Sequence, residues 1–209
     1  MLRDILRPLV PPSLRLIPRK LGGSLVDWFY GISTEGYYSL TVADQERVKH
    51  LDATSYQPCS YLALWMLSKR LPMAQTDVLY DLGCGKGRAV CFFGASGRLR
   101  KCVGVELVPM IADHARRNAA KLSETSPIDI ITDDAAAVEL SEGTIFLLFN
   151  PFGRDTLRAV LANIDKCRNR RRIFIVCFRP YLVDVYDACP WLEPYFKSAR
   201  FCIWKSVVG

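Results

Sequence analysis

The chain has 209 residues, of which 50% are hydrophobic and 23% are charged, a composition typical of a folded globular protein and not of a disordered or fibrous one. This length suits one α/β domain with a short extension and is too short for two domains of ordinary size. Lysine and arginine number 28 against 21 acidic residues, a formal net charge of +7. Such a surface tolerates anionic partners, including nucleic acid, but we favour the simpler interpretation of a charge that keeps the domain soluble.

Residues 1–50 form a proline-rich and then aromatic extension ahead of a predicted domain at 51–209. The first twenty residues mix apolar side chains with arginines and four prolines, which fits neither a signal peptide nor a transmembrane segment. Contact of residues 1–30 with a membrane surface stays open, because basic and apolar residues alternate there. The prolines would interrupt an amphipathic helix.

The eight cysteines are scattered, without a Cys-x-x-Cys pair, and the chain has only two histidines. This pattern predicts no metal site. Several cysteines lie inside apolar runs, as Cys177 does between Val176 and Phe178. They are typical of small core residues in a reducing compartment, and we expect a cytoplasmic protein.

A helix is expected at 59–71, where apolar residues recur at helical spacing. From residue 78 onward, short apolar runs alternate with helical periodicity, which predicts βαβ units around a parallel sheet. Five central strands with helices on both faces are expected at 78–82, 102–106, 128–132, 144–149 and 172–178.

Two crossover helices are expected to begin after Pro109 and after Gly153. Residues 195–204 are apolar runs separated by a polar turn, which predicts a terminal hairpin. The predicted fold class is therefore α/β, a Rossmann-like and mostly parallel sheet with an antiparallel C-terminal edge.

The strongest motif follows the first predicted strand, where Asp81 precedes three alternating glycines, Gly83, Gly85 and Gly87. Glycines at this spacing allow a sharp turn and a close approach of the backbone to a ligand, and the start of the next helix favours an anionic group. A dinucleotide fingerprint would need its third glycine at Arg88, and a P-loop would need Gly-Lys-Ser/Thr after a four-residue gap. The spacing fits neither motif.

Polar residues also end the second and fourth strands. Glu106 can accept two hydrogen bonds from a ribose diol, as acidic residues at this place do in nucleotide-binding folds. Asn150 and Phe152 bring an amide and an aromatic ring to the carboxyl edge of the sheet, where ligands of open α/β folds bind. An asparagine cap for the helix at 154–166 is the alternative interpretation.

Asp-Leu-Gly-Cys-Gly-Lys-Gly at 81–87 resembles the first motif of class I methyltransferases. With the loop at 31–36 and Tyr-Gln-Pro at 56–58, residues 31–179 resemble small bacterial relatives of the disruptor-of-telomeric-silencing protein lysine methyltransferases. This resemblance implies S-adenosylmethionine as cofactor and S-adenosylhomocysteine as its product. The cofactor-binding residues that it implies are Asp81, Gly83, Gly85, Gly87, Glu106, Leu107, Asp134, Ala135 and Glu35.

Asp133-Asp134-Ala135 resembles the adenine-side motif of this family, with Asp134 as the ligand of the adenine amino group and Asp133 as the alternative. Asn150-Pro151-Phe152 resembles the Asn-Pro-Pro-Tyr/Phe motif of methyltransferases that act on planar amino groups, without its second proline. The acceptor-site residues that these likenesses imply are Asn150, Pro151, Phe152 and Tyr56.

The expected function is methyl transfer to a nitrogen of a protein side chain. An RNA or small-molecule acceptor, and a noncatalytic cofactor-binding module, stay open. The basic run at 166–172 lies at the amino end of the fifth predicted strand, opposite the ligand edge. We interpret it as a solvated loop.

Overall fold

The computed structural model describes residues 23–36, 41, 57–122, 126–149, 152–168 and 172–207. Three predicted acceptor-site residues, Tyr56, Asn150 and Pro151, lie outside the described residues, as does the predicted domain boundary between residues 50 and 51. These predictions therefore stay predictions.

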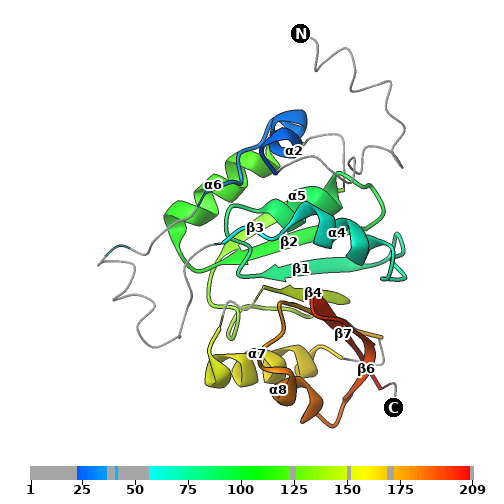
Figure 1. Cartoon of the computed structure of the whole chain (residues 1–209). Coiled ribbons are helices and arrows are strands. Elements are labelled where there is room, and N and C mark those ends of the chain that lie inside the picture. The colour runs from blue at the N-terminus through cyan, green and yellow to red at the C-terminus, as the bar shows by residue number, and fades with distance from the viewer. Residues whose placement is uncertain are drawn as a thin grey trace.

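A seven-stranded sheet in the order β3-β2-β1-β4-β5-β7-β6 forms the middle of the protein (Figure 1). Its strands are β1 (Val78–Leu82), β2 (Lys101–Glu106), β3 (Ile128–Thr132), β4 (Ile145–Leu148), β5 (Phe174–Phe178), β6 (Leu192–Lys197) and β7 (Phe201–Ser206). The first five strands pair in parallel, and β7 is antiparallel to both of its neighbours. The predicted Rossmann-like sheet with an antiparallel C-terminal edge is confirmed.

Helices cover both faces of this sheet. They are α2 (Gly23–Tyr30), α4 (Tyr61–Ser68), α5 (Arg88–Gly94), α6 (Pro109–Ala119), α7 (Arg154–Lys166) and α8 (Val183–Asp187). Helices α4, α5 and α6 lie on one side of the sheet, and α7 and α8 lie on the other (Figure 1). In the described ranges no helix combines the length and the apolar character needed to cross a bilayer.

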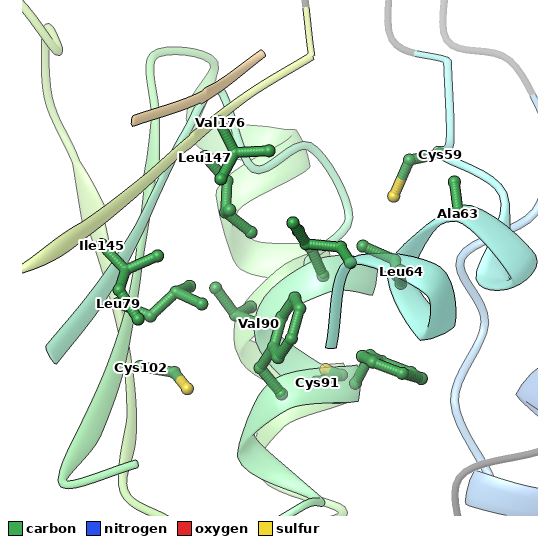
Figure 2. Packing of buried hydrophobic residues seen from close by; sticks show 14 of the residues in the cluster. Cys59, Ala63, Leu64, Leu79, Val90, Cys91, Cys102, Ile145, Leu147 and Val176 are labelled. Atoms are coloured by element: carbon green, nitrogen blue, oxygen red, sulfur yellow. The ribbon is translucent and has the colours of Figure 1, made fainter. Parts of the chain in front are cut away.

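Two apolar cores follow from the alternation of side chains along the strands. Leu79, Leu147 and Val176 point to the core beneath α4 and α5, where Figure 2 shows them opposite Leu64 and Val90. Their neighbours in the same strands point the other way and pack against α7 and α8; these include Tyr80, Phe146, Leu148, Ile175 and Cys177. Each central strand is thus buried on both faces, which explains its continuous apolar sequence.

The prediction that residues 128–132 form a central strand is wrong. β3 is the outer strand of the parallel part, with Asp129 and Thr132 exposed. Its three isoleucines, Ile128, Ile130 and Ile131, are half-buried and imitate the apolar run of a central strand. An edge strand lacks a neighbour on one side, so its polar side chains reach water.

The segment ahead of the predicted domain contributes to its core. Val26 and Tyr30 of α2 are buried in the same apolar cluster as α4 and α5. The sequence did not predict this helix, because its eight residues begin with a glycine and include three aromatic residues, which have modest helix propensity.

A methyl group added at Gly104 in β2 should destabilise the fold. Its Cβ would lie 2.7 Å from Cys84 Sγ and 2.8 Å from Ile130 Cδ1. We expect Gly104→Ala to lower the free energy of unfolding by about 1–3 kcal/mol, measured by urea denaturation. Adding Cys84→Ala should recover part of this loss, because it removes the nearest atom. Equal stability of Gly104→Ala and the natural chain would contradict the close packing.

Candidate functional site

The turn between β1 and α5 is built on three left-handed glycines. The φ angles are 82° at Gly83, 55° at Gly85 and 82° at Gly87, a region that side-chain-bearing residues avoid. The N–H groups of Gly83 and Cys84 donate to the Val105 carbonyl at 2.9 and 3.0 Å. The glycine turn is therefore fixed to the end of β2.

Glu106 joins this turn to the start of α6. Its Oε2 accepts a hydrogen bond from the Gly85 N–H, and its Oε1 accepts one from the Val108 N–H, both at 2.9 Å. Burial raises the pKa of Glu106, and the backbone N–H groups of Val108, Gly85 and Leu107 oppose that rise. Each carboxylate oxygen retains a lone pair for a ligand hydroxyl, because a carboxylate accepts about four hydrogen bonds in all.

Asp81 lies on the neighbouring strand, between Gly104 of β2 and Leu147 of β4. It is only 6% exposed. Burial and then the negative charge of Glu106 raise the pKa of Asp81 to about 7. A buried carboxylate whose ionisation is disfavoured by burial and by a second negative charge forms a place where a cationic group would be stabilised.

The loop after β3 completes this edge of the sheet. The Asp133 N–H donates to the Glu106 carbonyl at 3.2 Å. Asp134 Oδ1 accepts the Ala136 N–H at 2.9 Å, and Asp133 Oδ1 accepts the Asp134 N–H at 2.7 Å. Ala135 is buried beneath them. Both aspartates therefore stabilise their own turn, and the structure brings the residues predicted after β1, β2 and β3 to one edge.

The segment at 31–36 lies against the glycine turn. Lys86 Nζ donates to the Glu35 carbonyl at 2.7 Å. Asn118 Oδ1, on α6, accepts a hydrogen bond from the Ser33 N–H at 3.0 Å. Asn118 Nδ2 donates to the carbonyls of Ser33 and Lys86, both at 2.9 Å. Predicted residue Glu35 is thus brought beside the glycine turn by contacts with the turn itself.

A buried arginine anchors the same segment. Arg88 is 5% exposed. Its Nη2 lies 2.8 Å from Glu35 Oε1, its Nε donates to Thr34 Oγ1 at 2.6 Å, and its Nη1 donates to the Cys59 carbonyl at 2.9 Å. The carboxylate of Glu35 also approaches α2, since a Cβ at Gly23 would lie 1.6 Å from Oε1. Glu35 therefore faces Arg88 and α2.

Asp27 is the buried acidic partner in this cluster. It accepts hydrogen bonds from the backbone N–H and the hydroxyl of Thr34 and from the Tyr61 hydroxyl, and it lies 3.9 Å from Arg88 Nη2. Burial, and after it the charge of Asp27, raises the pKa of Tyr61. Buried charges need such partners, so the cluster holds together only when all of its members are present.

Aromatic side chains gather where β4 and β5 end. Phe149 follows β4, and its ring centroid lies 6.0 Å from that of Phe178. Predicted residue Phe152 is half-buried, and its carbonyl accepts the Tyr181 hydroxyl at 2.9 Å. β4 pairs with β1, the strand that carries Asp81.

A family model described as histone methylation protein DOT1 matches residues 38–143, just over half of the chain. The chain belongs to the DOT1 family. It is thereby placed among the class I methyltransferases, as the glycine turn and its two carboxylates had indicated.

Two curated proteins match this DOT1 relative over part of its length. A protein-lysine N-methyltransferase from Saccharolobus islandicus is 32% identical over 77 residues, which are 37% of this chain and 48% of that protein. A carboxy-S-adenosyl-L-methionine synthase from Pasteurella multocida is 31% identical over 90 residues, which are 41% of this chain and 36% of that protein. The chain thus spans about half, or less, of each relative.

Solved structures share its fold. The RNA methyltransferase from Salinibacter ruber, crystallised with S-adenosyl-L-homocysteine, has a TM-score of 0.54 and is 20% identical, with 73% of this chain and 94% of that chain covered. At this identity the likeness shows the arrangement of strands and helices.

The buried cluster around Arg88 and Asp27 that supports the site was not predicted from the sequence. Arg88 stands where a helix of this kind usually turns an apolar side chain inward, and Asp27 stands between apolar residues; both were available as signals of a buried ion pair. Asn118 gave no signal, because a polar residue in an amphipathic helix is ordinarily on the surface. Within the described ranges, no group of three or more histidine, cysteine, aspartate or glutamate side chains could hold a metal ion.

The buried Asp81 should lower the free energy of unfolding of the ligand-free protein as the pH rises. Its pKa rises from an ordinary 3.8 to about 7 in the folded state, so its contribution to stability is complete below about pH 4 and is lost by about pH 7. We expect Asp81→Asn to be more stable than the natural chain at pH 8 by roughly 1–4 kcal/mol and equal to it at pH 4, measured by urea denaturation.

Asp184→Asn is the matched control for this comparison. A hydrogen bond from Arg154 lowers the pKa of the exposed Asp184, so its removal should act in the opposite direction at pH 8. If Asp81→Asn were less stable than the natural chain at pH 8, burial would not dominate the ionisation of Asp81.

Proposed function

We propose that this protein transfers the methyl group of S-adenosylmethionine to a nitrogen of a protein side chain. One observation carries the proposal: a left-handed glycine turn is joined to two buried carboxylates, Asp81 and Glu106, at adjacent strand ends of a DOT1-family chain. The turn permits close approach of a ligand, and the carboxylates provide acceptors for an ammonium group and for a ribose diol.

The residues fit the cofactor in the following arrangement. Asp81 would pair with the ammonium group of the methionine part, and Glu106 would accept from the ribose hydroxyls with its remaining lone pairs. Leu107 and Ala135 would line the adenine, whose amino group would donate to Asp134, with Asp133 as the alternative acceptor. Glu35 would hold the segment at 31–36 against the glycine turn through its contacts with Lys86 and Arg88.

S-adenosylmethionine supplies a methyl group that is electrophilic because it is bound to a sulfonium. The protein then has to align an acceptor lone pair with that methyl group and to keep water away. An amine acceptor has to arrive neutral, since a protonated amine has no lone pair. Asn150 would orient the acceptor nitrogen through its amide oxygen, with the Phe152 ring and Tyr56 beside it.

A protein acceptor is favoured by the lysine methyltransferase relative, and the Asn-Pro-Phe segment after β4 favours a nitrogen as the acceptor atom. An RNA acceptor is supported by the net charge of +7. The likeness to the Salinibacter enzyme concerns the fold alone and does not bear on the acceptor. A small-molecule acceptor and a noncatalytic cofactor-binding module are the remaining alternatives, and labelling experiments distinguish all four.

We further infer that the protein works in the cytoplasm. All eight cysteines are free, and seven of them are buried. Burial raises the pKa of Cys59 and Cys91 to about 12, so these thiols are kept protonated and unreactive. Thiols used as apolar core residues are typical of proteins in a reducing compartment.

Affinity for S-adenosylhomocysteine, which carries the same amino-acid part as the cofactor, should depend on pH. It should rise between about pH 6 and 7.5, because Asp81 with a pKa of about 7 must be ionised to pair with the ammonium group. At still higher pH it should fall again, as the ligand's own α-amino group loses its proton. Calorimetry in buffers of different ionisation enthalpy measures both effects.

Two variants make this test specific. Asp81→Asn should lose most of the affinity together with the rise near pH 7. Glu106→Gln should weaken binding by about 1–3 kcal/mol and move the rise to lower pH, because the charge of Glu106 is one cause of the raised Asp81 pKa. Affinity that is unaffected in both variants would overturn the cofactor assignment.

Methyl transfer itself is tested by incubating the protein with methyl-labelled S-adenosylmethionine and with separated cell protein, RNA and metabolites. We expect label in the protein fraction. In that fraction Asn150→Ala should lower turnover about ten- to thousandfold through lost orientation of the acceptor, with little change in S-adenosylhomocysteine affinity.

Each other outcome has a definite meaning. Label in RNA or metabolites alone replaces the protein acceptor, and cofactor binding without label in any fraction favours the noncatalytic module. Unchanged turnover in Asn150→Ala would remove Asn150 from the acceptor site and direct attention to Glu35 and Tyr56; the helix cap that the sequence also allowed is not its role, since Gly153 is the N-cap of α7.

A further inference from the structure

We propose that Arg179 is a positioning residue of the acceptor site, where it fixes the segment after Tyr56 to the end of β4. The inference rests on the proposed methyl transfer and extends it to a side chain that the sequence did not suggest. Three observations carry it: an unfavourable backbone conformation, two contacts across distant parts of the chain, and the exposure of those contacts.

The backbone of Arg179 is held in a left-handed conformation. Its φ is +46°, and among the described residues every other positive φ belongs to a glycine. Arg179 directly follows β5, and its N–H donates to the Arg200 carbonyl at 2.9 Å, so the conformation is fixed from the start of β7. A side chain in this region costs free energy that glycine would spare, and such positions concentrate at ligand sites.

This conformation allows one guanidinium to contact two separate segments. Arg179 Nη1 donates to Gln57 Oε1 at 3.1 Å, across 122 positions of the chain, and its Cζ lies 5.5 Å from the Phe149 ring centroid. In the sequence, Gln57 comes directly after Tyr56 and Phe149 directly before Asn150. The two residues that Arg179 holds are thus the chain neighbours of two predicted acceptor-site residues.

The neighbouring side chains continue the same edge. Phe178 packs its ring against Phe149, and Tyr181 donates its hydroxyl to the Phe152 carbonyl at 2.9 Å. Phe178 and Tyr181 therefore contact Phe149, the residue before the Asn-Pro-Phe segment, and Phe152, its last residue.

Stability does not explain these contacts. Arg179 and Tyr181 are exposed, and an exposed hydrogen bond or cation–π contact contributes little to the free energy of unfolding. The left-handed conformation of this exposed arginine is better explained by the contacts that its guanidinium makes with Gln57 and Phe149. Arg179 would act through Gln57 and Phe149, and it is therefore a positioning and not a catalytic residue.

A pair of substitutions separates the backbone from the side chain. Arg179→Gly removes the side chain and relieves the left-handed conformation, whereas Arg179→Ala removes the side chain and keeps the strain. Arg158→Ala is the charge control, because Arg158 is an exposed arginine of α7 that pairs with Asp155. The readouts are methyl transfer to the fraction that the natural protein labels, S-adenosylhomocysteine affinity by calorimetry, and thermal unfolding.

We expect Arg179→Gly and Arg179→Ala both to lose about tenfold or more in turnover at saturating acceptor fraction, as orientation is lost. S-adenosylhomocysteine affinity should stay within about twofold, and Arg179→Gly should melt at the natural temperature or higher. Gln57→Ala should lose part of the same activity, and adding it to Arg179→Gly should cause little further loss, because both remove one contact. Arg158→Ala should behave as the natural protein.

Several results would overturn the inference. Natural turnover in Arg179→Gly would show that the side chain positions nothing. Parallel loss of turnover and S-adenosylhomocysteine affinity would place Arg179 in the cofactor site. A natural protein that binds S-adenosylhomocysteine but labels no fraction would refute the proposed methyl transfer and this inference together, an outcome distinct from loss in the variants alone.

Discussion

The carboxylate of Glu106 is the point at which the separate turns of this edge meet. One oxygen holds the glycine turn through Gly85 and the other holds the start of α6 through Val108, while the carbonyl of the same residue receives the loop after β3. A neutral or shorter side chain would leave backbone N–H groups without an ionised acceptor in a buried place. The relative positions of three loops therefore depend on one buried charge, and the proposed ligand would use lone pairs of the same group.

A second layer of buried charge supports that arrangement from outside the sheet. Arg88 begins α5 and connects Thr34, Glu35 and Cys59, so the segment ahead of the first strand is held onto the glycine turn. Loss of Arg88 would leave Asp27 without its cation in the core, which is costlier than losing an exposed pair. The upstream segment is thereby a structural part of the site, although more than forty residues separate it from that turn.

The parts of the protein that the sequence could predict are those set by local periodicity. The bounds of β1 and β3 and of the helix at 154–166 follow from apolar alternation and helical spacing, and the glycine turn follows from residue types that few other conformations require. The edge position of β3 was missed because isoleucines fit both edge and central strands. Asn118 and Arg179 could not be placed, since their roles depend on partners 32 to 122 positions away.

The burial of the cysteines makes the protein a reporter of its own unfolding. Cys189 is half-buried and the other seven cysteines are buried, six of them in the two apolar cores and Cys84 in the glycine turn. An alkylating reagent reaches a thiol only when the surrounding structure opens, and the raised pKa of a buried cysteine slows the reaction further. The order in which these thiols are modified would trace how the sheet comes apart, from the rim near α8 to the strands beneath α5, without any added probe.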